Sequence, residues 1–570
     1  MKGKKKVLVI GLDGATFDLI EPWVAEGKLP NLGALMKQGS WGHLISTLQS
    51  NSAQAWSTFM TGINAGKHGI FDFIRPIPGS YKVQFTNASL RDGKSLWKAV
   101  GEYGLKVGIM NVPMTYPPEP VNGFLISGMD APGVNSNFVY PAELLKELES
   151  NLGGYILEAG VTGLIRRGRP DLALSKMYET IEIRLKAAEY LMKNKEWNLF
   201  MVVFTEPDRA QHFFWKYINK AHPNYSESEA KKFGQGIFSI YEKLDRAIDK
   251  LLSLVPEETT VFIMSDHGGG PSSNKTFYIN KWLEAEGYLT FTSAGYVKDT
   301  LNKWKRNTLR KIDYYLSAKL PRWVKENLVR LLPGVRNKVG SALLLDNINW
   351  QKTKVFSRES APVISINLKG REPEGIVDLQ DYKQVQDEII ERLLSLRCPY
   401  TGEPIVSEVH RKEDIYSGAY SDLTPDLLIE WKNYKYIQRP SFLAKGGGFI
   451  EVLEGRELEM AERMSRPSGI HRPEGVVLCA GKGVKKGKRI QDAKLMDLHP
   501  TILYAMGLPI SEEVEGKVIE ELFESDFLSE NPIRIKRSEE VAGDTSKRKS
   551  FTDEESDIIK ERLSGLGYID

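Results

Sequence analysis

Runs of consecutive apolar residues recur through the first half of the chain, and each ends at a polar or glycine-rich stretch. Apolar side chains on both faces are typical of strands buried inside a parallel sheet. Segments with a helical period lie between the runs, so the alternation predicts an α/β fold with a doubly wound, mostly parallel sheet flanked by helices. The runs are Val7–Leu12, 106–111, 124–127, Leu199–Phe204 and Thr260–Met264.

The alternation breaks between residues 290 and 345 and resumes from 352. Within the break, residues 303–338 are rich in Trp and Tyr and carry eleven Lys or Arg against two acids. This pattern predicts a helical insertion or cap. It fits either a solvated helical face or contact with an anionic substrate or membrane surface.

The expected division of the chain follows from this break. It has a first part of the α/β core, a basic aromatic helical insertion or cap, a second part of the core with a late histidine, and a charged tail with a terminal helix. The corresponding ranges are 1–290, 291–346, 347–530 and 531–570.

Composition excludes several classes of protein. A net charge of +3 over 570 residues gives no global nucleic-acid signature. Two cysteines, Cys398 and Cys479, cannot form a disulfide framework or a thiolate zinc site. The basic start followed by Val7–Leu12 resembles a signal peptide, but the apolar run is too short for one and for a membrane span. We therefore expect a soluble, cytoplasmic protein.

Asp13 follows the first apolar run directly and precedes Gly14. An Asp-Gly pair after a strand is common turn chemistry. A carboxylate at the carboxyl end of a central strand also lies where open α/β sheets bind their ligands. Both interpretations of Asp13 are open from this stretch alone.

Other candidate metal ligands follow later runs. Asp208 and His212 have the i, i+4 spacing that puts both side chains on one face of a helix. Asp266 and His267 stand at a strand end before three glycines, which would let backbone approach a ligand closely. His471 lies in a predicted loop, next to a glycine and a proline.

These carboxylates and imidazoles are enough for two divalent cations. Asp13, Asp266 and His267 would hold one cation, and Asp208, His212 and His471 the other. Two cations about 4 Å apart can clamp the attacking and leaving oxygens of an in-line phosphoryl displacement.

A helix over 52–62 would supply the nucleophile from its start. With Ser52 as its N-cap, the hydroxyl lies beside helix amides that can bind a phosphate oxygen. Serine is a preferred N-cap without any catalytic role, and Ser50 is a rival nucleophile on local grounds.

Taken together, the motifs resemble the alkaline phosphatase superfamily, and within it the type I phosphodiesterase/nucleotide pyrophosphatase branch. They occur in the family's order between residues 7 and 475, and the C-terminal sequence Leu-Ser-Gly-Leu-Gly-Tyr-Ile-Asp looks typical of prokaryotic members. The motifs are Gly-Leu-Asp13-Gly, Ser52-x-x-x-Trp56-x-x-Phe59-x-Thr61-Gly62, Lys67-His68-Gly69, Glu-Pro-Asp208-x-x-x-His212, Ser-Asp266-His267-Gly and Gly-x-His471-Arg-Pro.

The resemblance implies the same two ligand sets, with the nucleophile Ser52 as a further, bridging metal ligand. Zinc is the usual metal in nucleotide pyrophosphatases and manganese in the mutase relatives. Counting back from Thr61-Gly62 places the nucleophile on Ser52 and not Ser50. The family's nucleotide pyrophosphatases carry a phosphate-binding asparagine three residues later, where this chain has Ala55. Gln54 could substitute for it, and Ala53 would offer a backbone amide.

The resemblance therefore implies a phosphoric ester hydrolase that cleaves phosphodiester or pyrophosphate bonds of a small-molecule substrate through a phosphoserine. Two divalent metal ions, zinc first and manganese as the alternative, would be its cofactors. A phosphomonoesterase or phosphomutase on the same site is the alternative enzyme, and a non-catalytic binding protein that retains the fold is the alternative of another class. Peripheral membrane contact through 303–338 is a further expectation.

Overall fold

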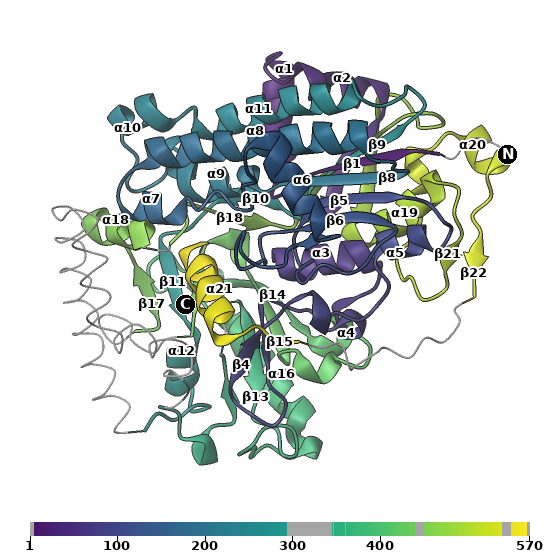
Figure 1. The fold of residues 1–570 in the computed structure, drawn as a ribbon. Helices are drawn as coiled ribbons and strands as arrows, with labels where there is room; N and C mark the ends of the chain where they lie inside the picture. Colours follow the sequence, from purple (N-terminus) through teal and green to yellow (C-terminus); the bar gives the residue numbers. More distant parts are fainter. Residues whose placement is uncertain are drawn as a thin grey trace.

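A nine-stranded, mostly parallel sheet forms the centre of the part of the chain that the structure, a computed structural model, describes (Figure 1). That part comprises residues 5–292, 345, 347–358, 361–440, 448–464, 466–537 and 549–566. The strand order is β20-β2-β19-β9-β1-β8-β5-β6-β7, which confirms the predicted α/β class. Their bounds are β1 (Val7–Leu12), β2 (Ser40–Ile45), β5 (Val107–Val112), β6 (Gly123–Ser127), β7 (Val139–Tyr140), β8 (Leu199–Phe204), β9 (Thr260–Met264), β19 (Glu474–Ala480) and β20 (Lys488–Lys494).

The first apolar run, β1, lies at the centre of this sheet, and all six of its residues are buried. It pairs in parallel with β8 on one side and β9 on the other. The register sets Leu12 beside Phe204, and Gly11 beside Met264. Three strands therefore end at the same edge, and the residues that follow them meet there.

Helices cover both faces of the sheet because each presents an apolar side to it. Figure 1 shows α1 (Phe17–Ala25), α2 (Pro30–Gln38), α8 (Pro170–Asn194) and α11 (Gly236–Leu252) along one face. Along the other face lie α3 (Ser52–Thr61), α5 (Leu96–Gly101) and α19 (Leu498–Ala505).

A second apolar core is built from residues between Phe277 and Ile450. The sequence predicted that residues 347–530 continue the α/β core. In the structure the strands before β19 join other sheets, and the chain returns to the central sheet only at β19. Apolar periodicity shows that a strand is buried but not which sheet it joins. We call this unit the second lobe; it contains β12 (Val355–Phe356), β13 (Val363–Ile366), β15 (Leu427–Trp431), β14 (Val406–Arg411), β16 (Ile437–Arg439), β11 (Lys275–Tyr278), β17 (Ile450–Val452), α12 (Ile279–Ala285) and α16 (Tyr382–Ser395).

The predicted helical insertion over 291–346, with its basic segment 303–338, lies outside the described residues except for Phe291, Thr292 and Leu345. In the expected tail, a helix is present as α21 (Asp553–Leu566), which packs its apolar side on the main core. None of the helices in the described part of the chain is long and apolar enough to cross a membrane.

Shorter elements complete the described chain. They are β3 (Ile74–Pro76), β4 (Val83–Phe85), α4 (Ala65–His68), α6 (Glu143–Leu152), α7 (Thr162–Arg166), α9 (Glu206–Phe214), α10 (Glu227–Phe233), β10 (Gly268–Pro271), α17 (Lys412–Ile415), α18 (Gly455–Met464), β18 (Gly469–Arg472), β21 (Ile510–Ser511), α20 (Ser525–Glu530) and β22 (Ile535–Lys536).

Candidate active site

Three buried aspartates meet at the carboxyl edge of the central strands. Asp13 follows β1, Asp266 follows β9, and Asp208 lies in the first turn of α9, which begins two residues after β8 ends. Asp208 and His212 lie one helical turn apart on α9, as their spacing predicted. The sheet register therefore gathers carboxylates that are up to 253 positions apart (266 − 13) in the chain.

Asp13 and Gly14 form a turn and also belong to this cluster, so the two interpretations of the stretch are compatible. Gly14 has a φ of 70°, which favours glycine. A Cβ on Gly14 would lie 2.9 Å from the Cβ of Asp208. A side chain at this position would therefore push Asp208 away from Asp13.

Ser52 is the first residue of α3 and not its N-cap, which corrects the sequence-based expectation. The cap is Asn51, whose side-chain oxygen accepts a hydrogen bond from the Gln54 amide at 2.9 Å. Asparagine and serine are both good caps, so local sequence could not rank them. The Ser52 hydroxyl, free of capping, lies 3.3 Å from Nε2 of His267.

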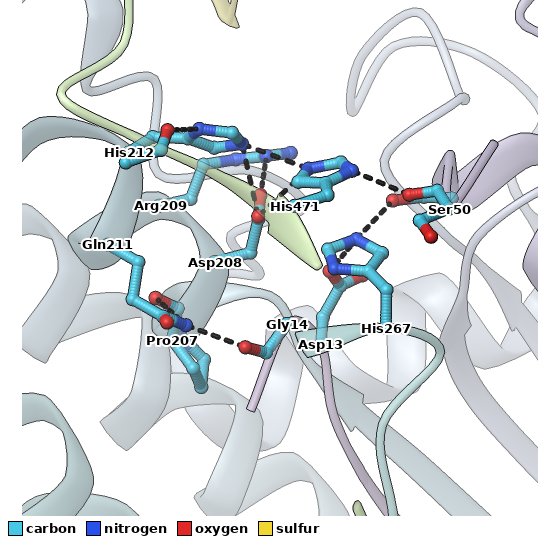
Figure 2. Close-up of polar contacts among 12 residues, drawn as sticks. Asp13, Gly14, Ser50, Pro207, Asp208, Arg209, Gln211, His212, His267 and His471 are labelled. Atoms are coloured by element: carbon cyan, nitrogen blue, oxygen red, sulfur yellow. Dashed lines mark hydrogen bonds and ion pairs between the residues drawn. The ribbon is translucent and has the colours of Figure 1, made fainter. Parts of the chain in front are cut away.

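Ser50 contributes its backbone rather than its hydroxyl to this cluster. Its hydroxyl donates to the carbonyl of Thr47 at 3.2 Å, while its own carbonyl accepts a hydrogen bond from Nδ1 of His471 at 2.7 Å. Figure 2 shows Ser50 beside His471 at this contact.

His471 lies on strand β18 and not in a loop, which corrects a second expectation. Its register partner is Gly269 in the antiparallel pair of β18 with β10. A four-residue strand next to glycine and proline resembles a loop until its distant partner is known. A Cβ on Gly269 would lie 2.2 Å from the side-chain oxygen of Gln211. The missing side chain of this glycine therefore makes room for Gln211 of α9 and not for a ligand.

Backbone carbonyls hold the Nδ1 atoms of three histidines. Nδ1 of His212 lies 2.8 Å from the carbonyl of Gly469, and Nδ1 of His267 lies 2.9 Å from the carbonyl of Gly268. Together with the bond from His471 to Ser50, these contacts select the tautomer that leaves each Nε2 as an electron-pair donor.

Each aspartate is held in the same manner through one oxygen. Oδ2 of Asp13 accepts from the indole of Trp56 at 3.2 Å, and Oδ1 of Asp266 accepts from the Gly14 amide at 3.4 Å. Oδ2 of Asp208 accepts from Arg209 at 2.7 Å. The opposite oxygens of Asp13 and Asp266 are buried and have no hydrogen-bond partner among the described residues.

The remaining atoms of these residues converge, as Figure 2 shows for Asp208, His212 and His471. Oδ1 of Asp208 lies 3.0 Å from Nε2 of His212 and 3.3 Å from Nε2 of His471, and the two nitrogens are 3.1 Å apart. Three electron-pair donors so close together repel one another unless a cation lies among them. The donor set therefore fits a divalent cation.

His267 links this group to a second one. Its Nε2 lies 3.4 Å from Oδ2 of Asp266 and 3.8 Å from Oδ1 of Asp13. It also belongs to a candidate ligand group with Asp208 and His471. Asp13, Asp266 and His267 thus form one group, as expected, and His267 also adjoins the ligands of the second expected set.

Burial sets the protonation preferences of the cluster. Burial, followed by the charges of Asp266 and Asp208, raises the pKa of Asp13 well above its ordinary value. Burial also raises the pKa of Asp266 to about 7. It lowers the pKa values of His267 and His471 to about 4. Neutral imidazoles suit cation binding, and bound cations would offset the cost of burying charged carboxylates.

Two contacts that hold the ligands were missed from the sequence. Trp56 lies one helical turn after Ser52, so an i, i+4 comparison could have associated it with the site. Arg209 is the neighbour of Asp208 on α9, and consecutive helical residues ordinarily point apart. Nothing in the sequence signals its contact with Asp208.

Gln54, an expected substrate-binding residue, is buried, and its side-chain nitrogen donates to the hydroxyl of Tyr416 in the second lobe at 3.1 Å. Ala53 lies fully buried in the first turn of α3. His410, which had no evident partner in the sequence, lies with Glu408 and Glu430 in an exposed to half-buried group on β14 and β15.

A cleft of about 660 Å³ opens beside the cluster and runs between the main core and the second lobe. His212, His471 and Ser50 lie on its wall, so the cleft reaches the candidate metal ligands directly.

The sheet architecture with its carboxylate and imidazole cluster defines an α/β protein with a candidate metal-binding site. A family model described as type I phosphodiesterase / nucleotide pyrophosphatase matches residues 7–439. The chain belongs to this family, whose members are phosphoester-cleaving enzymes of the alkaline phosphatase superfamily. His471 lies beyond the matched residues, and the fold alone brings it to the site. The chain matches no curated protein.

Two solved structures resemble this chain at low sequence identity, and the first of them shares its fold. Phosphonoacetate hydrolase from Sinorhizobium meliloti 1021, in complex with phosphonoformate, has a TM-score of 0.52 at 12% identity. The match covers 88% of this chain and 95% of that one. Murine ectonucleotide pyrophosphatase / phosphodiesterase 5 has a TM-score of 0.48 at 13% identity, covering 91% of this chain and 100% of that one.

Proposed function

We propose that this enzyme hydrolyses phosphodiester or pyrophosphate bonds with two divalent cations, and that Ser52 is its nucleophile. Six side chains would hold the cations: Asp13, Asp266 and His267 on one side, and Asp208, His212 and His471 on the other. One observation carries the proposal. Each ligand has one polar atom held by a protein donor or carbonyl, while its other atom faces the cluster.

The donor set favours zinc over manganese. Three imidazole nitrogens and three carboxylates suit a borderline ion such as zinc, whereas manganese prefers sites richer in oxygen. Manganese remains the alternative metal because half of the ligands are carboxylates.

Ser52 supplies the attacking oxygen. Its hydroxyl is 3.3 Å from His267, at the boundary between the two ligand groups. Bound cations would lower the pKa of this hydroxyl and neutralise charge on the departing oxygen. As Ser52 Oγ bonds to phosphorus, the bond from phosphorus to the leaving oxygen breaks, and water then cleaves the resulting phosphoserine.

The start of α3 provides a place for the phosphoryl oxygens. Asn51 caps the Gln54 amide, which leaves the amides of Ser52 and Ala53 as first-turn donors beside the nucleophile. The bond from Gln54 to Tyr416 ties α3 to the second lobe, so we assign phosphate binding to the Ala53 amide before the Gln54 side chain.

Metal removal and reconstitution test this function. The chelated protein is assayed on p-nitrophenyl phosphate, bis(p-nitrophenyl) phosphate, a nucleotide-sugar and a dinucleotide, before and after addition of zinc, manganese or calcium. We expect chelation to abolish turnover, zinc or manganese to restore it with the diester ahead of the monoester, and calcium to leave it low.

Three outcomes would contradict parts of this proposal. Turnover that survives chelation would exclude the two-cation site. Faster hydrolysis of the monoester would favour the phosphomonoesterase alternative. Absence of turnover on the whole panel by the metal-loaded protein would favour the binding-protein alternative.

A further inference from the structure

The C-terminal helix α21, yellow in Figure 1, reaches the candidate active site. Its last residue, Leu566, lies on the wall of the same cleft as His212 and His471. Ile559 and Leu563 are buried with it in the main core. The helix is therefore a part of the main core that extends to the site, although none of the proposed ligands lies on it.

Close contacts at both ends fix the position of α21. A Cβ on Gly565 would lie 2.5 Å from the methyl carbon of Thr162 at the start of α7, so the missing side chain lets the two helices approach closely. In the first turn of α21, the carboxylate of Glu555 accepts a hydrogen bond from the hydroxyl of Tyr116 at 2.7 Å. These contacts hold Arg562, which lies between them on the helix, in a defined place.

Arg562 binds the loop that follows β6. Its guanidinium donates to the carbonyl of Met129, to that of Ala131 at 2.6 Å and to that of Pro132 at 3.0 Å. Because β6 is parallel to β5, and β5 to β8, this loop lies at the same edge of the sheet as the candidate ligands. Arg562 therefore ties α21 to the edge of the sheet that carries the site.

Arg209 connects the same loop to a candidate metal ligand. This arginine is 1% exposed, and it donates to Sδ of Met129 at 2.9 Å and to Oδ2 of Asp208 at 2.7 Å. Figure 2 shows the contact with Asp208. The other oxygen of Asp208 faces His212 and His471, so a rotation of Arg209 would turn Asp208 away from the proposed cation.

Glu158 interacts with both arginines. Its Oε1 lies 3.4 Å from Nε of Arg209, and its Oε2 is buried without a hydrogen-bond partner in the described part of the chain. Burial lowers the pKa of the Arg562 guanidinium; the charge of Glu158 opposes this shift, and that of Arg209 adds to it. One buried carboxylate thus balances two buried cations, so the loss of Arg562 would change the balance that holds Arg209.

We propose that Arg562 is a positioning residue of the active site, which acts on Asp208 through the loop at 129–132 and Arg209. The inference rests on the proposed function and concerns the cation that Asp208, His212 and His471 would hold. It makes the C-terminal helix necessary for full cation affinity and not only for the fold.

Zinc binding by the full chain tests this role without requiring turnover. Competition with a chromophoric chelator measures a dissociation constant for each of the two proposed zinc ions. Arg562→Met retains the apolar stem and removes the donors, so we expect the zinc ion at Asp208 to bind about tenfold more weakly and the other to stay within about twofold of wild type. The visible absorption of cobalt bound in place of zinc should change as well, because it reports the geometry of the ligands.

Three further variants control the measurement. Arg562→Lys keeps a cationic donor and should recover part of the affinity, whereas Lys560→Met removes a charge from the same helix and should change neither constant. Met129→Leu conserves volume but removes the sulfur that accepts from Arg209, so it should weaken the same zinc ion by about threefold.

Two sets of results separate this role from the proposed function. Zinc constants that are unchanged, or weakened equally, in Arg562→Met and Met129→Leu would overturn the role of Arg562. Selective weakening of one zinc ion, in a protein that turns over no substrate of the panel, would support the role of Arg562 and contradict the proposed hydrolysis.

Discussion

At the scale of single residues, the site is defined by what holds each ligand as much as by the ligands. Trp56 and Arg209 each occupy one oxygen of an aspartate, and the carbonyl of Ser50 occupies one nitrogen of His471. Such outer contacts fix the orientation and tautomer of metal ligands. The two nearby serines differ in the same way: the carbonyl of Ser50 orients His471, whereas the hydroxyl of Ser52 lies 3.3 Å from Nε2 of His267.

Ser52→Ala tests this difference in roles. Removing the attacking oxygen should lower the turnover of bis(p-nitrophenyl) phosphate by about 1,000-fold or more. The content of bound zinc, measured by atomic absorption, should stay at the wild-type level because all six ligands remain.

Ser50→Ala is the matched comparison. Its hydroxyl bonds to Thr47 while its carbonyl, which the substitution keeps, orients His471. We expect turnover within a few-fold of wild type. Loss of turnover in Ser50→Ala together with its retention in Ser52→Ala would assign the nucleophile to Ser50.

At the scale of elements, α3 is the helix whose position decides where Ser52 lies. All ten of its residues are buried. Two buried histidines hold it: Nε2 of His68 lies 3.0 Å from the hydroxyl of Thr58, and Nδ1 of His499 lies 3.0 Å from the carbonyl of Met60. The Ile70 amide donates to Nδ1 of His68, which requires the neutral imidazole.

Acid should therefore destabilise the protein through His68. Burial, with the charge of Arg91, lowers its pKa to about 3, whereas an unfolded chain would take up the proton near 6.5. Below pH 6.5 the unfolded state binds more protons, so stability falls as pH decreases. We expect a loss of about 2 kcal/mol in unfolding free energy between pH 7 and pH 5 from this residue, measured by urea denaturation.

His68→Asn provides the control, since asparagine stays neutral and keeps an acceptor near the Ile70 amide. The variant should be less stable than wild type at pH 7 but should lose less stability on acidification. An identical pH dependence in the variant and the wild type would show that His68 does not contribute to it.

At the scale of the whole molecule, the proposed cations would join segments from residue 13 to residue 471. Without them, Asp13, Asp208 and Asp266 are buried close together, and burial raises the pKa values of Asp13 and Asp266. Ligands that bind only the folded state stabilise it. Metal binding and folding should therefore be coupled across both ends of the chain.

Chelation should lower the thermal unfolding midpoint by about 5 °C or more, measured by calorimetry with and without zinc. Ser52→Ala should keep this shift. Asp266→Asn should lose it and should make the metal-free protein more stable than metal-free wild type, because a buried carboxylate is replaced by a neutral amide. A zinc-dependent shift that persists in Asp266→Asn would exclude Asp266 as a ligand.

The sequence by itself determined the central strands and the polar residues that follow them. The apolar runs of β1, β8 and β9 are typical of parallel strands buried on both faces, and the carboxyl ends of parallel strands share one edge, which brings Asp13, Asp208 and Asp266 together. The pair Asp208 and His212 followed from helical spacing alone. These are consequences of local pattern and of strand polarity.

The tertiary structure alone decided the remaining features. It placed His471 on β18 opposite Gly269, made Asn51 and not Ser52 the cap of α3, and gathered residues between Phe277 and Ile450 into the second lobe that walls the cleft. Periodicity reports that a side chain is buried, but the partner it is buried against is chosen by packing between distant segments.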